Sequence, residues 1–344
     1  MQQHAEYIEP SSAGTVSCDS ERSCGKDADP GPGRCDDASR MATPDRTADQ
    51  SMDTNVVTPA AISVRGSMIK IAALAAEPYE DVADPQAVVR SFAGSRVSAD
   101  LFTFIQRPPD TTPKFDYAVE WDNMAVLEVT DYDHWWTKQV NDKTRNLVRK
   151  AEKKGVVVRQ VPFDEALQRG IADIYNETPI RQGRQFWHYG KDAGTVRREN
   201  EEYADRSEYF AAFHGDEIIG FMRLVHDEKL TNIMYILSKI AHREKAPNNA
   251  LIAHAVKRCA AFGRRDIVYA KYVYGKKGED KLTDFKRHNG FRKIDIPRYY
   301  IPLTLKGRMA LQFHLHHGVQ SVIPQRLYTH LVALRNSWYG SRAS

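Results

Sequence analysis

The sequence predicts an α+β fold in which helices flank a sheet, and a polar segment precedes it. The clearest observation is in residues 246–296, which read as helix, strand, helix, strand. The first of these helices opens at Pro247 and stops at Gly263, and its apolar residues recur with the helical period. A second observation is the run 214–217, His-Gly-Asp-Glu, which lies between two apolar stretches and indicates a β-hairpin. The third is a sharp change of composition near residue 67.

Size, composition and charge limit the class of protein. The chain has 344 residues, of which 42% are hydrophobic and 27% charged, as in ordinary soluble proteins. No apolar run approaches the roughly 20 residues that span a membrane, and the start has no apolar signal-peptide core, so the sequence predicts a cytoplasmic protein. Residues 1–60 contain 11 acidic and 5 basic residues and so carry a charge of −6. Because the net charge of the whole chain is +4, the remaining residues carry +10. This charge suits anionic partners such as CoA, nucleotide-linked sugars, tRNA or an anionic membrane surface, although solubility alone explains it equally well.

The chain divides into four expected segments. Residues 1–67 have Tyr7 as their only aromatic residue and are predicted to be a disordered tail, with Met68 as an alternative start. Residues 68–155 are predicted to form a reduced N-terminal subdomain, residues 156–304 the main domain, and residues 305–344 amphipathic C-terminal helices. These last helices either pack on the domain or contact a membrane surface. No Cys/His spacing in the tail, which holds three of the four cysteines, matches a zinc site, so we expect no metal and no disulfide framework.

A basic helix is predicted at the end of the N-terminal subdomain, over residues 131–155. Asp131 or Asp133 can cap it and Gly155 can end it. Its polar face is basic: Lys143, Arg145, Arg149, Lys150, Lys153 and Lys154. The face is either a solvated helix surface or a contact for phosphates or RNA.

Two motifs resemble a known family. The segment TRNLVRKAEKKGV (144–156) and the segment LTDFKRHNGF (282–291) are similar to motifs of the GNAT acyltransferase superfamily, in its branch related to the Fem-type aminoacyl transferases that build peptidoglycan cross-bridges. The resemblance covers about 160 residues. It implies a mixed, mostly antiparallel sheet flanked by helices. It also implies transfer of an acyl group from acetyl-CoA, another acyl-CoA or a similar activated donor to an amine, such as an amino sugar or a cell-envelope precursor.

Two departures from the superfamily pattern keep other functions open. The segment 243–250, REKAPNNA, lacks the glycines that let backbone amides approach the CoA pyrophosphate. Lys286 stands where many members have a tyrosine, and a lysine there agrees with the Fem-type pattern. The missing glycines and the basic helix favour an aminoacyl-tRNA donor as the alternative. A catalytically inactive binding module is a third interpretation.

The candidate site residues follow from the motifs and from the resemblance. The expected catalytic residues are Lys286, His188 as general base, and Tyr235. The expected donor-binding residues are Ile236, Leu237, Ser238, Arg243, Asn248 and Asn249. The loop 181–191, rich in guanidinium and aromatic groups, is expected to bind the acceptor through Arg181, Arg184, Trp187, Tyr189 and Lys191. The alternatives are a surface loop anchored by its aromatics, a structural histidine, simple helix capping by the asparagines and a solvated Lys286.

Overall fold

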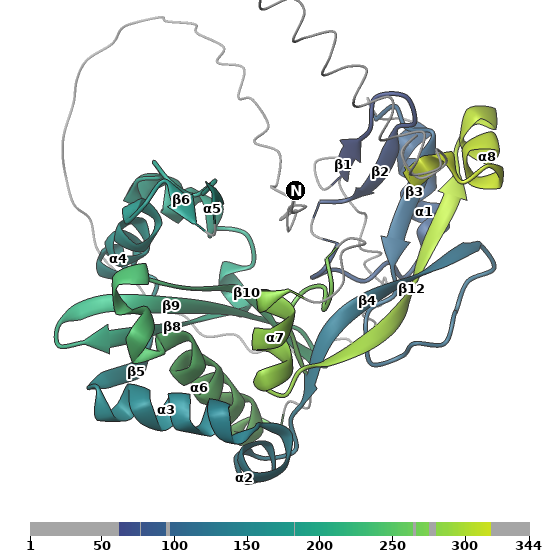
Figure 1. Cartoon of the computed structure of the whole chain (residues 1–344). Helices are drawn as coiled ribbons and strands as arrows, with labels where there is room; N and C mark the ends of the chain where they lie inside the picture. Colours follow the sequence, from purple (N-terminus) through teal and green to yellow (C-terminus); the bar gives the residue numbers. More distant parts are fainter. Residues whose placement is uncertain are drawn as a thin grey trace, which may run out of the picture.

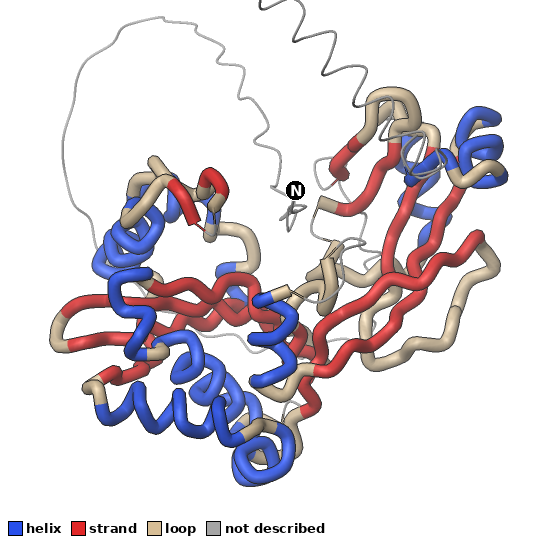
Figure 2. The backbone as a smooth tube through the Cα atoms, viewed as in Figure 1, coloured by secondary structure: helices blue, strands red, loops and turns tan. Residues whose placement is uncertain are grey.

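The predicted α+β class is confirmed in the computed structural model, where a large mixed sheet is flanked by helices (Figures 1 and 2). The structure describes residues 62–75, 77–93, 97–181, 183–263, 266–274 and 280–317. Expectations for residues 1–61 and 318–344 lie outside these ranges. No helix of the described part is long and apolar enough to cross a membrane.

The main sheet has ten strands in the order β1-β2-β3-β12-β4-β11-β10-β9-β8-β5. Only the β2–β3 and β10–β11 pairs are parallel. Its strands are β1 (Ile62–Arg65), β2 (Ile71–Leu74), β3 (Leu101–Ile105), β4 (Ala118–Glu128), β5 (Val156–Val161), β8 (Ser207–His214), β9 (Glu217–His226), β10 (Leu230–Ser238), β11 (Asp266–Val268) and β12 (Arg292–Pro302). A separate two-stranded ribbon comprises β6 (Ile180–Arg181) and β7 (Arg184–Gln185). The expected hairpin at 214–217 is the β8–β9 turn.

One sheet runs through both the N-terminal segment and the main segment of the sequence. Strand β4 precedes residue 131, yet it lies between β11 and β12, antiparallel to both. At the N-terminal end of this segment, the boundary expected after residue 67 falls inside a hairpin, because β1 pairs with β2. The N-terminal segment therefore completes the sheet instead of adding a separate layer.

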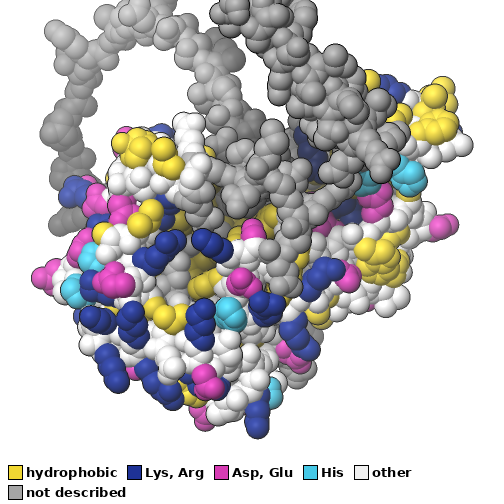
Figure 3. All heavy atoms as spheres, in the orientation of Figure 1, with side chains coloured by type: hydrophobic (Ala, Val, Ile, Leu, Met, Phe, Trp, Pro, Cys, Tyr) yellow, Lys and Arg dark blue, Asp and Glu magenta, His cyan; other side chains and the backbone are white. Residues whose placement is uncertain are grey.

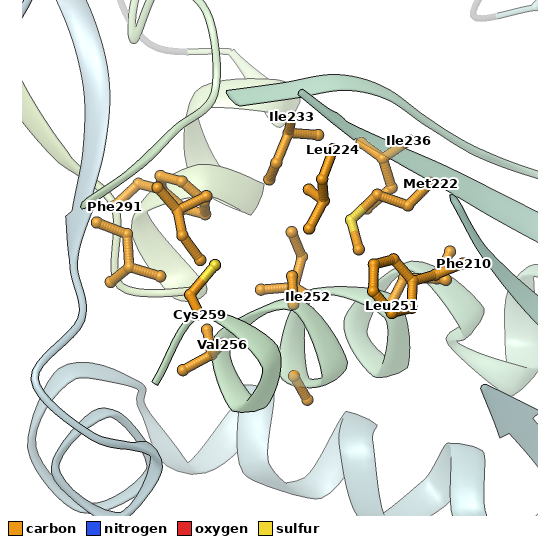
Figure 4. Packing of buried hydrophobic residues seen from close by; sticks show 14 of the residues in the cluster. Phe210, Met222, Leu224, Ile233, Ile236, Leu251, Ile252, Val256, Cys259 and Phe291 are labelled. Carbon is orange, nitrogen blue, oxygen red and sulfur yellow. The ribbon is translucent and has the colours of Figure 1, made fainter. Parts of the chain in front are cut away.

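Helices cover both faces of the sheet. The described helical elements are α1 (Pro85–Ala93), α2 (Tyr132–His134), η2 (Trp135–Gln139), α3 (Asp142–Lys153), α4 (Glu165–Asn176), α5 (Ala193–Glu199), η3 (Ala204–Arg206), η4 (Ile240–Lys245), α6 (Pro247–Ala261), α7 (Lys281–His288), α8 (Leu305–Gln312) and η5 (Leu315–His317). Alternating residues of β9 separate the two cores: Met222 packs towards α3 and α6, whereas Phe221 packs towards α4 and α5. Figure 4 shows the first core, where side chains of β8, β9 and β10 meet Leu251, Ile252, Val256 and the buried Cys259 of α6.

The helix expected over residues 131–155 is broken into two parts, which corrects the sequence prediction. Asp131 caps the first part as expected, but Val140 is extended and Asn141 caps α3 through the Thr144 N–H, 2.9 Å away. The turn before the break is a π-helix, and it places Trp135 in the core with its indole N–H donating to the Asn289 carbonyl at 3.0 Å. The break lets α3 turn and lie along α6.

Candidate active site

The central feature of the site is a parallel strand pair that separates. Strands β10 and β11 pair only from Leu230–Asp266 to Asn232–Val268. Just beyond this point β10 has a bulge between Ile233 and Tyr235, and it continues to Ser238 paired with β9 alone on its other side. Among the described residues, no strand pairs with this second edge of β10 beyond Asn232. The expected donor residues Ile236, Leu237 and Ser238 therefore lie on a strand edge that no described strand covers, although the Ser238 carbonyl accepts from Arg181.

Lys286 lies on α7, over the chain that continues β11. Its side chain is fully buried, and its Nζ donates to the Lys271 carbonyl at 2.5 Å. The ammonium faces the rings of Tyr269 and Tyr274, with 4.5 and 5.0 Å between Nζ and the ring centroids. Desolvation lowers the pKa of Lys286 to about 7, and Asp280 opposes this only weakly. The structure thus contradicts a solvated helix lysine and instead holds a lysine that titrates near neutral pH.

The segment 269–274 is fixed against β4, so the position of Lys286 is well defined. Val273 and Asn123 exchange two hydrogen bonds, one from the Val273 N–H at 2.8 Å and one from the Asn123 amide at 3.4 Å. Ala270 and Tyr269 bond the backbone of Ala125. Lys271 adds an ion pair with Asp122, with 2.7 Å between Nζ and Oδ2. These contacts hold the chain on β4 while β10 diverges from it.

The loop between β10 and α6 contains no glycine, yet one of its residues has a left-handed backbone. Ala246 has φ 54°, in the left-handed region that favours glycine, and it begins α6 with no side-chain cap. The asparagines are inside the helix and do not cap it: Asn249 is buried and its amide bonds Asn289 at 3.2 Å. The Oδ1 atom of Asn248 has no hydrogen-bond partner. The uncapped helix start, with Arg243 exposed nearby, retains its positive dipole end for an anion.

A carboxylate clamp ties this loop to α4. The Glu177 oxygens accept from the Ile240 N–H at 2.6 Å and the Ala241 N–H at 2.8 Å. Arg181 completes the clamp by donating to the Ser238 carbonyl at 3.0 Å and to the Ile174 carbonyl at 2.9 Å. Arg181 therefore supports the end of β10, and two amides at the start of the loop are already satisfied.

The loop 181–191 packs His188 into the core, whereas Trp187 and Tyr189 stay exposed. His188 is buried and stacks on Tyr175, 4.0 Å between ring centroids, while Tyr235 is buried on β10 beside it. Desolvation lowers the pKa of His188 to about 2, with Lys191 and Arg181 acting in the same direction. A histidine so hard to protonate is unsuited to act as a general base at neutral pH. The pair stabilises the aromatic core behind β10.

The rim of the same loop is exposed. Trp187 and Tyr189 are 41% and 48% exposed, and the Lys191 ammonium lies 3.8 Å from the Trp187 ring centroid. The backbone of Arg184 is in β7, and its side chain lies outside the described residues. Arg181, at the start of the loop, contacts the end of β10 directly.

Several important residues were missed by sequence reasoning. Tyr269 and Tyr274 face the Lys286 ammonium, and Glu177 binds the loop between β10 and α6. None of these three residues belongs to a recognisable motif. The available signal was the run 269–274, YAKYVY, whose three tyrosines carry large aromatic faces directly after a strand. Two surface hollows, of about 650 and 920 Å³, are lined by other residues, among them Gln139 and Lys138 in the first and Pro109 and Asp227 in the second.

Comparison with known proteins supports the fold. No protein-family model and no curated protein matches the chain. Among solved structures, FemX is 11% identical and has a TM-score of 0.51, with 72% of this chain and 85% of FemX covered. The C-terminal domain of a putative lysylphosphatidylglycerol synthetase from Agrobacterium fabrum is 15% identical, with 73% and 83% covered and a TM-score of 0.48. L-PGS from Bacillus licheniformis is 13% identical, with the same coverage and a TM-score of 0.47.

The chain has the fold of FemX. This likeness confirms, at the level of fold, the predicted resemblance to the Fem-type branch of the GNAT superfamily. The open edge of β10 beside the short parallel strand β11 is the part of this fold on which the candidate site is built.

Proposed function

We propose that the protein is an N-acyltransferase that moves an acyl group from an activated donor, such as an acyl-CoA, to an amine. The acceptor is an amino sugar, a cell-envelope precursor or a similar small amine. Two observations carry this proposal: the open edge of β10, and on α7 a buried lysine with a pKa near 7. The edge can hold an extended donor by backbone hydrogen bonds, as an added strand is held.

The chemistry assigns a role to each group. The amine nitrogen bonds to the acyl carbon and loses one proton, and the bond from this carbon to sulfur or oxygen breaks. The leaving atom takes up one proton, so the reaction releases no net proton from a neutral amine. Backbone N–H groups of the β10 edge, around Ile236 to Ser238, polarise the carbonyl and bear the developing oxyanion. Lys286 in its cationic form stabilises the same charge and can supply the proton to the leaving group, because its pKa lies close to the working pH.

A second donor is favoured by one observation. The exposed basic residues of α3 lie beside η4, which contacts α3 directly, so positive charge continues from Arg243 along α3. Figure 3 shows Lys and Arg gathered over this part of the surface. CoA would contact only the loop between β10 and α6. A polyanion such as tRNA would also contact the exposed basic face of α3, which comprises Lys143, Arg149, Lys150, Lys153 and Lys154. In addition, the Ile240 and Ala241 N–H groups already donate to Glu177, so fewer backbone donors of this loop are free for a pyrophosphate. An aminoacyl-tRNA donor is therefore the second candidate.

The donors can be separated by thermal stabilisation. A ligand that binds the folded state raises the melting temperature by mass action. If the donor is an acyl-CoA, excess acetyl-CoA should raise it, and Arg243→Glu should reduce the shift while Arg197→Glu, on exposed α5, should leave it unchanged. If the donor is an aminoacyl-tRNA, the tRNA should stabilise instead, and Lys150→Glu with Lys153→Glu should weaken its binding and flatten its salt dependence. Stabilisation by neither donor would contradict the proposal and favour a binding module for another ligand.

A further inference from the structure

A cluster of two histidines and a glutamate joins the C-terminal end of the described chain to the sheet. Glu120 projects from β4, and His316 and His317 belong to η5, about 196 residues later. The Nε2 atoms of the two histidines lie 2.8 and 2.9 Å from the same Glu120 oxygen. All three ligand atoms lie within 4.8 Å of one another. This cluster lies at the β1–β3 end of the sheet with α8, well separated from α6 and α7 (Figure 1).

The hydrogen bonds of His316 do not match a neutral imidazole. Its Nδ1 lies 3.3 Å from the Ala310 carbonyl and its Nε2 lies 2.8 Å from the Glu120 carboxylate. Both partners accept hydrogen bonds, but a neutral imidazole carries a single N–H. If Nδ1–H donates to the carbonyl, the Nε2 lone pair faces a carboxylate oxygen, which is repulsive. If Nε2–H donates to the carboxylate instead, the Nδ1 lone pair lies 3.3 Å from the Ala310 carbonyl. Both contacts are favourable together only if the ring carries a second proton or if a cation lies between nitrogen and oxygen.

The surroundings of His316 are those of a metal-binding histidine. A ligating imidazole usually donates its other N–H to a carbonyl or a carboxylate, which fixes the ring before the metal arrives. Here the Ala310 carbonyl has that position, and Tyr300 packs edge-on against the ring at 4.8 Å between centroids. The His316 side chain is 2% exposed, whereas that of His317 is 42% exposed, so one ligand is fixed and the other opens to solvent.

We propose that Glu120, His316 and His317 form a site for a divalent transition metal ion of the Zn²⁺ class. Two imidazoles and one carboxylate are a ligand set that Zn²⁺ takes in tetrahedral sites, with a water in the fourth position. Imidazole ligands select such ions over Mg²⁺ and Ca²⁺, which prefer oxygen alone. At metal–ligand distances near 2.0 Å, the ligand atoms lie roughly 3.3 Å apart. The two nitrogen–oxygen distances, now 2.8 and 2.9 Å, would therefore lengthen by about 0.4 to 0.5 Å.

A bound ion would stabilise the fold by linking two elements that are remote in sequence. It joins η5, which follows α8, to β4 in the middle of the sheet. The sequence predicted no metal because only Cys/His spacing in the tail was considered. The available signal was the run His314-Leu315-His316-His317, but the carboxylate that completes the set is remote in sequence.

The test is metal content and metal-dependent stability of the full chain, prepared without a histidine tag. After gel filtration in the presence of equimolar ZnCl₂, the protein should retain about one zinc per chain by elemental analysis, and protein stripped with EDTA should melt at a higher temperature when micromolar ZnCl₂ is restored. His317→Asn should abolish both effects without unfolding the protein, because this side chain is largely exposed. Glu120→Gln should reduce them strongly.

A matched control separates this site from other histidines. His242 also contacts a carboxylate, with 3.2 Å between its Nε2 and Glu217, and the centroid of the His214 ring lies 5.7 Å from that of its own ring. Among the described residues, however, these three side chains do not form a group with ligand atoms within 4.8 Å of one another. His242→Asn should therefore retain the bound zinc and the stabilisation. If the unmodified protein retains no zinc and shows no stabilisation, or if His317→Asn retains both, the metal site is overturned and the cluster is a protonated histidine paired with a carboxylate.

Discussion

At the scale of single residues, Lys286 shows how burial determines chemistry. The sequence motif gave its position before Asn289, Gly290 and Phe291, and the structure adds that it is fully buried beside two tyrosine rings. Burial disfavours the ammonium and lowers its pKa, whereas the Lys271 carbonyl favours it. The motif alone could not reveal this balance, because it depends on the tyrosines of segment 269–274.

Replacing Lys286 by Met should stabilise the protein and slow the reaction. The Lys286 pKa in the folded state, about 7, lies below its unfolded value near 10.4. Below pH 7 both states are protonated and the folded state bears the full cost of the buried charge. As the pH rises from 7 towards 10.4 this cost fades, because the folded state has lost the proton and removing it costs less free energy at higher pH. The melting temperature of Lys286→Met should therefore exceed that of the parent most at pH 6 to 7, and the two should converge near pH 10.

The same variant should lose roughly a hundredfold or more in turnover, with a smaller change in donor affinity, if the ammonium acts on developing charge. Lys281→Met, an exposed position on the same helix, should change neither property. A rise in the Michaelis constant with unchanged turnover would mean that Lys286 only holds the donor. Equal stability of parent and Lys286→Met across pH 6 to 10 would contradict the buried ammonium.

At the scale of elements, helix starts and turns were predicted well where local chemistry decides them. The helix expected to open at Pro247 does so as α6, and the hairpin expected at 214–217 is the β8–β9 turn. The break at Val140 was not predictable, because it depends on Trp135 reaching the Asn289 carbonyl on a distant helix. Likewise, the bulge that separates β10 from β11 leaves no signal in the apolar pattern. Long-range packing, which no local pattern encodes, decided both.

The Asp280 cap controls the helix that carries Lys286. Its carboxylate accepts from the Leu282 and Thr283 N–H groups, each at 2.9 Å. Asp280→Ala should lower the free energy of unfolding by about 1 kcal/mol, whereas Asp280→Asn should retain most of it, because an amide oxygen also caps. Urea denaturation measures the difference. Asp284→Ala, which removes only an exposed ion pair with Arg287, should cost less than about 0.5 kcal/mol. Equal losses for Asp280→Ala and Asp284→Ala would argue against capping.

At the scale of the whole molecule, a buried ion network joins the N-terminal segment to the rest. Arg298 on β12 forms two 2.8 Å contacts with Glu77 and one of 2.9 Å with Asp122 on β4. Burial alone would raise the pKa of Asp122, but Arg298 and Lys271 hold it below its usual value. The network connects residues more than 200 positions apart, and Lys271 extends it to the carbonyl that holds Lys286. Composition and motifs divided the chain near residue 155, but the pairing of remote strands shows how closely the two segments are integrated.

Strand β4 should therefore be indispensable to the folded state. Ala125 and Leu127 on β4 are fully buried in the core that also contains α6, and β4 fills the position between β11 and β12. A chain that begins at residue 131 would expose the edges of both strands together with that core, so it should show no cooperative melting and should aggregate. A chain that begins at residue 62 retains β1 and should melt as the full chain does, since composition predicts that residues 1–61 add no apolar core. Adding a separately expressed fragment of residues 62–130 to the shorter chain should restore part of the cooperative transition. Cooperative melting of the 131–344 chain on its own would instead show that the main segment is an autonomous domain, with β4 an accessory to its sheet.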